Sequence, residues 1–216
     1  MERASNPLNH AILGTLRSPL FYMSLENKLL YSISSIANVN YWALPKCGNT
    51  TIKYKLLEKY EPDVVSSMAI NGIDDWVHGY KLMDYITPFD AMSNGKYNFT
   101  FVRNPIDRFV SMYKDFCTTR SIIKAVEGLS IDAFIDYLEV ELEAEICANI
   151  HFRTQQYFLE YFEGDIFNID DYTQSKLNHR AKSVELTTQQ CERVERLYIN
   201  DYRYLDNVTD IEKFIY

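Results

Sequence analysis

The stretch Tyr41-Trp42-Ala43-Leu44-Pro45-Lys46-Cys47-Gly48-Asn49-Thr50-Thr51 decides the fold of this chain. An apolar run ends at its proline, and Lys46 and Gly48 follow before a helix-patterned segment over residues 52–60. A strand, a tight loop and a helix N-terminus in this order make an anion site, because backbone N–H groups and the helix dipole point at the same place. The lysine adds a full charge, and the two threonines add hydroxyl donors. The stretch therefore predicts that a phosphate-like group is held here.

Length and composition fit one folded domain over residues 1–216. Hydrophobic residues make up 47% of the chain, which is enough for a substantial core. The formal net charge of −8 argues against a nucleic-acid binder, which needs a basic stripe. A local basic pocket built from a few positioned residues is still compatible with this charge.

Signals for export, membrane insertion or metal binding are weak. Polar residues interrupt the apolar pieces at the N-terminus and near residues 26–28, so the sequence predicts neither a signal peptide nor a membrane span. The four cysteines show no CxxC spacing, which argues against a metal site and a disulfide framework. Free thiols are typical of a reducing compartment, and we therefore expect a cytoplasmic protein.

Strand and helix patterns alternate along the chain on both sides of the opening stretch. Strands are predicted over Asn38–Leu44, Tyr97–Val102 and Asp165–Ile169, and the second is apolar or aromatic at nearly every position. Helices are predicted over these segments: Thr50–Tyr60, Asp63–Gly72, Ile106–Phe116, Ile131–Leu142 after Ser130 as cap, Phe152–Phe162, and Val194–Leu205 after a capping box at Thr187 and Gln190. This alternation predicts an α/β fold with a parallel sheet covered on both faces.

Two segments do not follow that alternation. Residues 1–37 have scattered apolar spacing and are predicted to form an N-terminal helical extension or flap. Residues 73–92 are predicted to be irregular, with a polar cluster that includes His78.

A second motif follows the strand that ends at Val102. Phe101–Tyr113 has the sequence FVRNPIDRFVSMY, which resembles V-R-[DN]-P-x-[DE]-R-x-x-S-x-Y, the 3′-phosphate segment of sulfotransferases. Pro45–Thr51 resembles their 5′-phosphosulfate loop, P-K-x-x-x-[ST]-[ST]. The order, the separation and the strand–loop–helix settings all agree. The chain is similar to the family that contains the carbohydrate (type 2) sulfotransferases and their soluble bacterial and viral relatives, which implies a three-layer, P-loop-like fold with a central parallel sheet.

Three weaker similarities extend the resemblance over residues 38 to about 205. Trp76–Tyr80 is similar to a histidine-glycine segment that supplies the catalytic base in uronyl 2-O-sulfotransferases. Asn149–Gln155 resembles an H-[WF]-x-P-Q segment in which Thr154 replaces the proline. His179–Ser183 resembles a late H-x-N-x-S loop in which Ala181 replaces the asparagine.

The resemblance implies 3′-phosphoadenosine 5′-phosphosulfate (PAPS) as the sulfuryl donor. It gives Lys46 a catalytic role at the bridging oxygen as the bond to sulfur breaks. The 5′-phosphate would be held by loop amides and hydroxyls: Lys46, Cys47, Gly48, Asn49, Thr50 and Thr51. The 3′-phosphate would be held by Arg103, whose guanidinium suits bidentate binding, and by Ser111. Arg108, elsewhere on the same helix, is expected to make structural ion pairs.

The acceptor hydroxyl must lose a proton, so a base is needed near the sulfur. We expect His78 in this role, since a neutral imidazole works near pH 7, and His151 is the second candidate. The resemblance favours a carbohydrate among hydroxyl-bearing acceptors and implies no metal. Neither the acceptor's identity nor the oligomeric state follows from the sequence.

Two other functions are also compatible with the sequence. A P-loop nucleotide kinase or NTPase would hold phosphates on a similar loop, although the G-x-x-x-x-G-K-[ST] spacing and an obvious Mg²⁺-binding aspartate at a strand end are missing from the sequence. A non-catalytic binder would keep the nucleotide pocket and lack the base.

Overall fold

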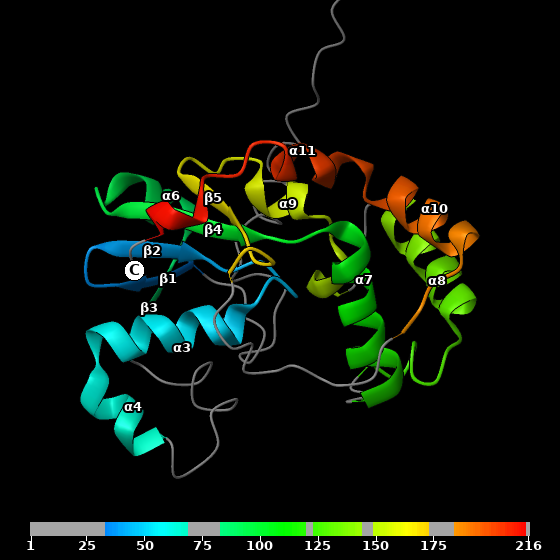
Figure 1. The fold of residues 1–216 in the computed structure, drawn as a ribbon, viewed down its shortest axis with the longest axis horizontal. Helices are drawn as coiled ribbons and strands as arrows, with labels where there is room; N and C mark the ends of the chain where they lie inside the picture. The colour runs from blue at the N-terminus through cyan, green and yellow to red at the C-terminus, as the bar shows by residue number, and fades with distance from the viewer. Residues whose placement is uncertain (1–32, 69–82, 120–122, 144–148, 173–183, 215–216) are drawn as a thin grey trace, which may run out of the picture.

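The computed structural model of the chain describes residues 33–68, 83–119, 123–143, 149–172 and 184–214. Figure 1 shows a sheet with helices around it. In chain order the elements are β1 (Ile33–Ile36), β2 (Val39–Trp42), α3 (Asn49–Tyr60), α4 (Pro62–Met68), β3 (Asp84–Ile86), α6 (Pro88–Ser93), β4 (Tyr97–Val102), α7 (Pro105–Tyr113), the π-helical segment η1 (Lys114–Thr119), α8 (Ile131–Glu143), the 3-10 turn η2 (Ile150–Phe152), α9 (Gln155–Leu159), β5 (Asp165–Asn168), α10 (Thr188–Leu197), the 3-10 turn η3 (Ile199–Asp201), α11 (Tyr202–Leu205) and the 3-10 turn η4 (Ile211–Lys213).

The sheet is mixed, with the strand order β3-β1-β2-β4-β5. The β2, β4 and β5 strands are parallel neighbours, which confirms that part of the predicted sheet. The prediction of an all-parallel sheet is wrong at β1, which pairs antiparallel with both β2 and β3. Ile36 pairs with Val39, so only two residues separate β1 from β2. A connection this short can join only antiparallel strands.

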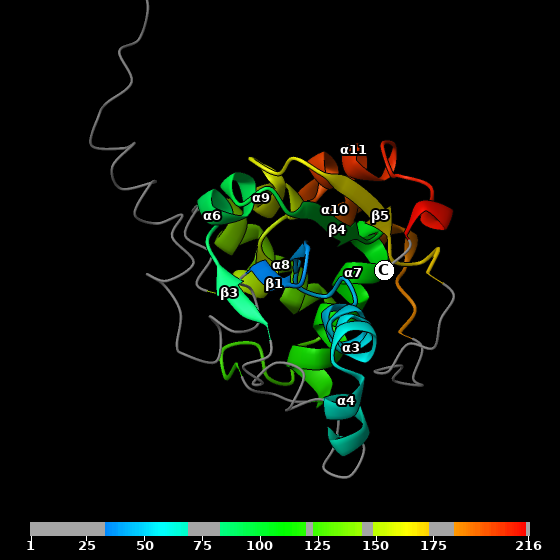
Figure 2. The same ribbon diagram turned by 90° about the vertical axis from the view of Figure 1, so that its left-hand side faces the viewer.

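Both faces of the sheet carry helices, as Figures 1 and 2 show. On one face Tyr41, Phe99 and Phe101 pack in one cluster with the buried side of α3. On the other face Trp42 packs with α6, and Val102 packs with α9 and α11. Both faces of β2 and β4 are therefore buried at the centre of the sheet, and even the polar Asn40 and Thr100 are fully buried.

The helices α7, α8 and α10 lie beyond the carboxyl end of β4 and share a second core with η1 (Figure 1). The α8 helix begins as predicted, where Ser130 Oγ accepts from Ala133 N at 3.3 Å. The predicted capping box of Thr187 and Gln190 is also confirmed at the start of α10. These two helices owe their positions to local signals that the sequence carries.

Four sequence-based expectations are corrected within the described residues. The helix predicted over Val194–Leu205 is divided, because α10 ends at Leu197 and η3 separates it from α11. The single helix predicted over residues 152–162 is divided into η2 and α9, because Thr154 is extended and caps α9 through Tyr157 N. The segment predicted as irregular contains β3 and α6. The C-terminal part of the predicted N-terminal helix is β1, while residues 1–32 lie outside the described part of the chain.

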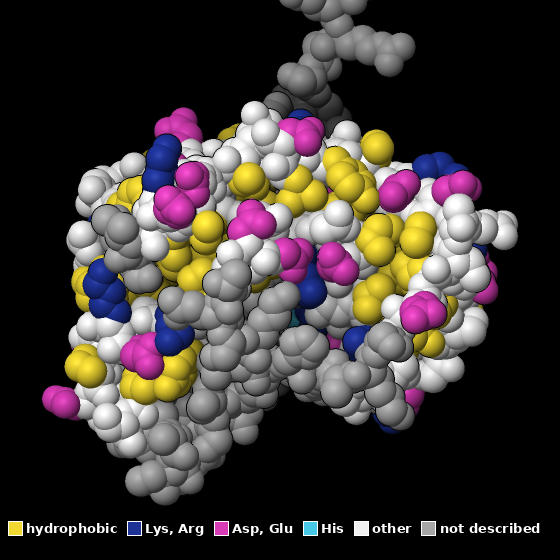
Figure 3. Space-filling view, in the orientation of Figure 1, with side chains coloured by type: hydrophobic (Ala, Val, Ile, Leu, Met, Phe, Trp, Pro, Cys, Tyr) yellow, Lys and Arg dark blue, Asp and Glu magenta, His cyan; other side chains and the backbone are white. Residues whose placement is uncertain are grey.

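The surface in Figure 3 shows basic and acidic side chains interspersed over the described residues. No helix in the described ranges combines the length and the apolar character needed to cross a membrane.

Candidate active site

The loop between β2 and α3 turns sharply at Lys46 and Gly48. Both residues have left-handed backbones, with φ of 67° and 82°. Gly48 is the N-cap of α3, and no side chain caps this helix end within the described structure. The N–H groups of a helix's first turn have no partner inside the helix. In α3 they point out of the helix N-terminus, towards the loop. This geometry is compatible with the anion site that the sequence predicts.

Cys47, at the centre of this loop, has a backbone amide that is already bonded. Its N–H donates to Leu44 O at 3.2 Å, so this amide closes the loop and the amides offered to an anion begin at Gly48. The thiol is buried and lies 3.3 Å from Gln155 Oε1. Burial raises the pKa of the thiol to about 12, which makes Cys47 inert as a nucleophile.

The second motif leaves β4 beside that loop. Asn104 caps α7 by accepting from Ile106 N at 2.9 Å, and Pro105 is the first helical residue, as predicted. Trp42 of β2 pairs in parallel with Thr100 of β4, so both strands end at the same edge of the sheet. The two motifs therefore open on one side of the molecule.

Arg103 lies at this edge of the sheet. Its backbone N–H and carbonyl are both hydrogen-bonded, whereas one nitrogen of its side chain is not. Gln155 Oε1 accepts from Arg103 N, and Gln155 Nε2 donates to Arg103 O, each at 2.8 Å. The Arg103 Nε atom is buried, lies 3.7 Å from Asp170 Oδ1, and has no hydrogen-bond partner among the described residues. Buried donors are rarely left unbonded in proteins, so an acceptor from a ligand fits here. Ser111 lies farther along α7 and is partly buried.

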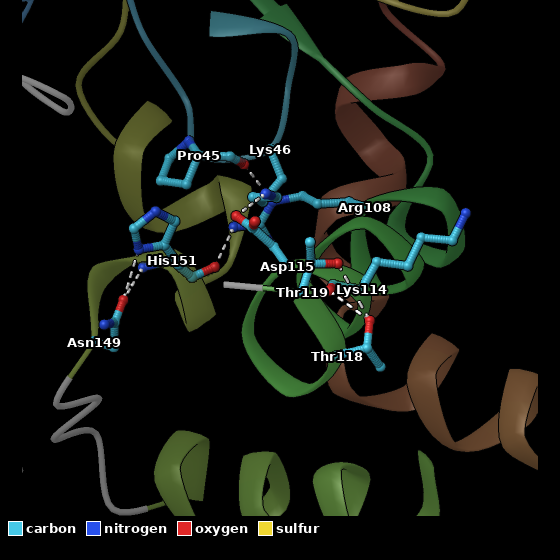
Figure 4. Close-up of polar contacts among 9 residues, drawn as sticks. All are labelled: Pro45, Lys46, Arg108, Lys114, Asp115, Thr118, Thr119, Asn149 and His151. Carbon is cyan, nitrogen blue, oxygen red and sulfur yellow. Dashed lines mark hydrogen bonds and ion pairs between the residues drawn. The ribbon is translucent and has the colours of Figure 1, made fainter. Parts of the chain in front are cut away.

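Arg108 joins three segments around the site. It is 1% exposed, and it donates from Nε to Pro45 O at 3.0 Å. Its NH2 atom donates to His151 O at 3.1 Å (Figure 4). The same atom donates to Arg153 O at 2.7 Å. The expected structural role is confirmed, but the bonds are to carbonyl oxygens where ion pairs were predicted. Arg108 thereby fixes the backbone that carries Lys46.

Lys46 meets a partner that the sequence analysis missed. Its Nζ atom lies 2.6 Å from Asp115 Oδ2 and 5.6 Å from the centre of the Phe116 ring. Asp115 and Phe116 belong to η1, which continues α7. Figure 4 shows Asp115 beside Lys46. The signal was available, because Asp115 follows Ser111 by four residues and so lies near the same side of the helix.

Of the two candidate bases, only His151 is in the described part of the chain; His78 and the segment Trp76–Tyr80 lie outside it, as does His179–Ser183. His151 Nδ1 is 2.7 Å from Asn149 Oδ1, and its ring lies edge-on to Phe116 with centroids 4.6 Å apart. Burial lowers the pKa of His151 to about 3. The imidazole is therefore neutral at pH 7, but such a low pKa makes it a weak proton acceptor.

A sequence model of the sulfotransferase family matches residues 32–158, which is more than half of the chain. The chain belongs to the sulfotransferase family. The match contains both sequence motifs, Asp115 and His151. A search of curated proteins and a search of solved structures each gave no match. Family membership identifies the protein as an enzyme that transfers sulfuryl groups.

Proposed function

We propose that this sulfotransferase moves a sulfuryl group from PAPS to an acceptor hydroxyl by direct in-line transfer. The observation that carries the proposal is the bond between the two motifs, in which Arg108 Nε donates to Pro45 O at 3.0 Å. A donor with phosphate at both its 5′ and 3′ ends needs two anion sites at a fixed separation. The shared sheet edge and this bond support such a pair of sites.

The residues present fit the donor. At the 5′ end we assign the amides of Gly48, Asn49, Thr50 and Thr51 together with the two threonine hydroxyls. At the 3′ end we assign Arg103 and Ser111. The buried Arg103 Nε atom that has no hydrogen-bond partner in the described structure supports this assignment. Cys47 supports the loop through its bond to Leu44 and is not assigned an amide contact.

PAPS, when bound, supplies the activated sulfuryl group. The Lys46 ammonium then stabilises the negative charge that develops on the leaving phosphate oxygen. The acceptor oxygen forms its bond to sulfur on the opposite side, while its proton passes to a base. We assign the base to the imidazole of His78, with His151 second because of its low pKa. No metal is needed in this scheme.

The proposed acceptor is the hydroxyl of a carbohydrate. The proposal rests on the resemblance of both motifs to carbohydrate sulfotransferases. The test is to mix the purified protein with ³⁵S-labelled PAPS and a panel of glycans, phenols and tyrosyl peptides. Binding of the product nucleotide, 3′-phosphoadenosine 5′-phosphate (PAP), is measured in parallel by calorimetry.

We expect PAP to bind and the label to move to at least one glycan. Lys46→Ala should lower transfer by about 100-fold or more, as is typical when a group that stabilises developing charge is removed. Tight PAP binding without transfer to any acceptor would instead indicate a non-catalytic binder. Magnesium-dependent ATP turnover without PAP binding would indicate a P-loop NTPase.

A further inference from the structure

Lys46 and Asp115 form a largely buried ion pair at the centre of the proposed active site (Figure 4). The Nζ and Oδ2 atoms are 2.6 Å apart, and the two side chains are 13% and 6% exposed. The residues are 69 positions apart in the chain. The Asp115 carboxylate thus contacts the Pro45–Thr51 motif, although Asp115 itself lies in the helical segment that follows the Phe101–Tyr113 motif.

The same helix also holds the backbone of Lys46. Arg108 on α7 donates to the carbonyl of Pro45, and the Phe116 ring on η1 faces the ammonium. A lysine has a long flexible stem, and its ammonium has no fixed fork that would orient it. Without these contacts its charge would occupy many positions, whereas in-line transfer requires charge at one position.

Stability alone does not account for this carboxylate. A buried ion pair adds little net stability, because the loss of hydration offsets the attraction between the charges. Asp115 also places a negative charge beside a loop that we propose to bind an anion, and like charges oppose such binding. A residue that lowers donor affinity in this way must contribute to another step, and its contact with Lys46 indicates which one.

Resting on the function proposed above, we propose that Asp115 is a positioning residue for Lys46. Its carboxylate holds the ammonium charged and in place, at the point where the leaving phosphate oxygen gains charge. An ammonium has three N–H donors, so a bond to Asp115 uses one of three donors that Lys46 carries. Asp115 itself takes no proton and forms no covalent bond.

The competing role for Asp115 is that of the base that deprotonates the acceptor. The two roles differ in how they depend on Lys46. A positioning residue acts through the lysine, so its loss has little further effect once the lysine has been removed. A base acts on the acceptor, so its loss lowers transfer whether or not the lysine is present.

The test is a double-mutant cycle of Asp115→Asn and Lys46→Ala. Asparagine keeps the shape and one oxygen acceptor, so it avoids leaving an unpaired buried lysine beside a cavity. Glu127→Gln is the matched control, because Glu127 is an exposed acid that carries the same charge. Single-turnover transfer from labelled PAPS is measured with the panel acceptor that the wild type sulfates best, and PAP binding is measured by calorimetry.

We expect Asp115→Asn to lower the single-turnover rate about 10-fold to 100-fold. PAP affinity should stay unchanged or rise, because a negative charge has been removed. In the Lys46→Ala background the same substitution should change the rate less than about twofold. Equal losses in both backgrounds, or an unchanged rate in the wild-type background, would overturn the proposal.

An acceptor-independent measurement separates this inference from the function on which it rests. The Lys46 ammonium should give a slowly exchanging ¹⁵N NMR signal, identified by its loss in Lys46→Arg, that disappears in Asp115→Asn. If this signal behaves as expected but the wild type neither binds PAP nor transfers label, the proposed function fails while the pairing stands. If PAP binds and label moves but the signal does not depend on Asp115, the positioning role is wrong.

Discussion

At the scale of single residues, Gly48 shows how two requirements meet at one position. Its φ of 82° is in the left-handed region, which residues with a Cβ rarely adopt. A Cβ at Gly48 would also lie 2.6 Å from Ile169 Cδ1. The sequence indicates that the loop needs a glycine near an anion, but it cannot show the contact with Ile169, which comes from a distant part of the chain.

We expect Gly48→Ala to destabilise the protein by about 1–3 kcal/mol and to weaken PAP binding. Gly128→Ala is the matched control, since Gly128 has φ of 69° but a Cβ added there would meet no atom of the described residues within 4 Å. Urea unfolding should show a smaller loss for the control than for Gly48→Ala. Adding Ile169→Val should recover part of the difference, and equal losses at the two glycines would contradict the packing argument.

The buried imidazole of His151 should make the folded protein less stable in acid. Burial lowers its pKa from 6.5 to about 3, so between these values the unfolded chain binds a proton that the folded protein does not. Stability is therefore lost as the pH falls from 6.5 towards 3. Between pH 7 and pH 4.5 the wild type should lose roughly 2 kcal/mol more free energy of unfolding than His151→Gln. Urea titrations at the two pH values measure this, and parallel losses would show that His151 does not contribute.

At the scale of elements, α9 holds the end of β4 through one side chain. Gln155 is fully buried, and its amide bonds both the N–H and the carbonyl of Arg103. Its own N–H donates to Asp201 Oδ2 at 2.9 Å, which anchors α9 to η3. Gln155 thus fixes the backbone of Arg103, although Gln155 itself is not proposed to contact the donor.

We expect Gln155→Ala to lower the free energy of unfolding by about 1–3 kcal/mol, because the partly buried N–H and carbonyl groups of Arg103 lose their partners. PAP binding should weaken as well, since the position of Arg103 at the 3′-phosphate would be less defined. Gln156→Ala is the control, because the bond from Gln156 to Asp201 uses its backbone N–H. Calorimetry with PAP should separate the two variants, and similar affinities would contradict this role for α9.

The elements that the sequence predicts well are those with local signals. The bounds of β4 were predicted as observed, and α7 starts at the predicted cap because Asn104 and Pro105 act within their own turn. The β1 strand has serines at its two central positions, both buried, and its structure depends on pairing with β2 and β3. The helical spacing from Ser111 places Asp115 near the second motif, but its pairing with Lys46, 69 residues away, has no local signal.

At the scale of the whole molecule, the site lies where the sheet meets the helices that follow β4 (Figure 1). The sequence predicts that two loops share an edge, because parallel strands end together. It does not predict which residue holds the two loops at a fixed separation. In the structure this is Arg108, whose guanidinium bonds the first loop and the segment at residues 151–153, and also lies over the Tyr198 ring.

Arg108→Lys should therefore weaken folding and donor binding together. A lysine keeps the charge but cannot reproduce the three directed bonds of the guanidinium, so we expect a loss of about 3 kcal/mol in stability. PAP should raise the melting temperature of the wild type through its binding free energy, and this rise should shrink strongly in the variant. Arg193→Lys is the control, because Arg193 bonds Glu139 and Asp136 between α10 and α8, away from both loops. A full PAP-induced rise in Arg108→Lys would show that the two motifs hold their separation without this residue.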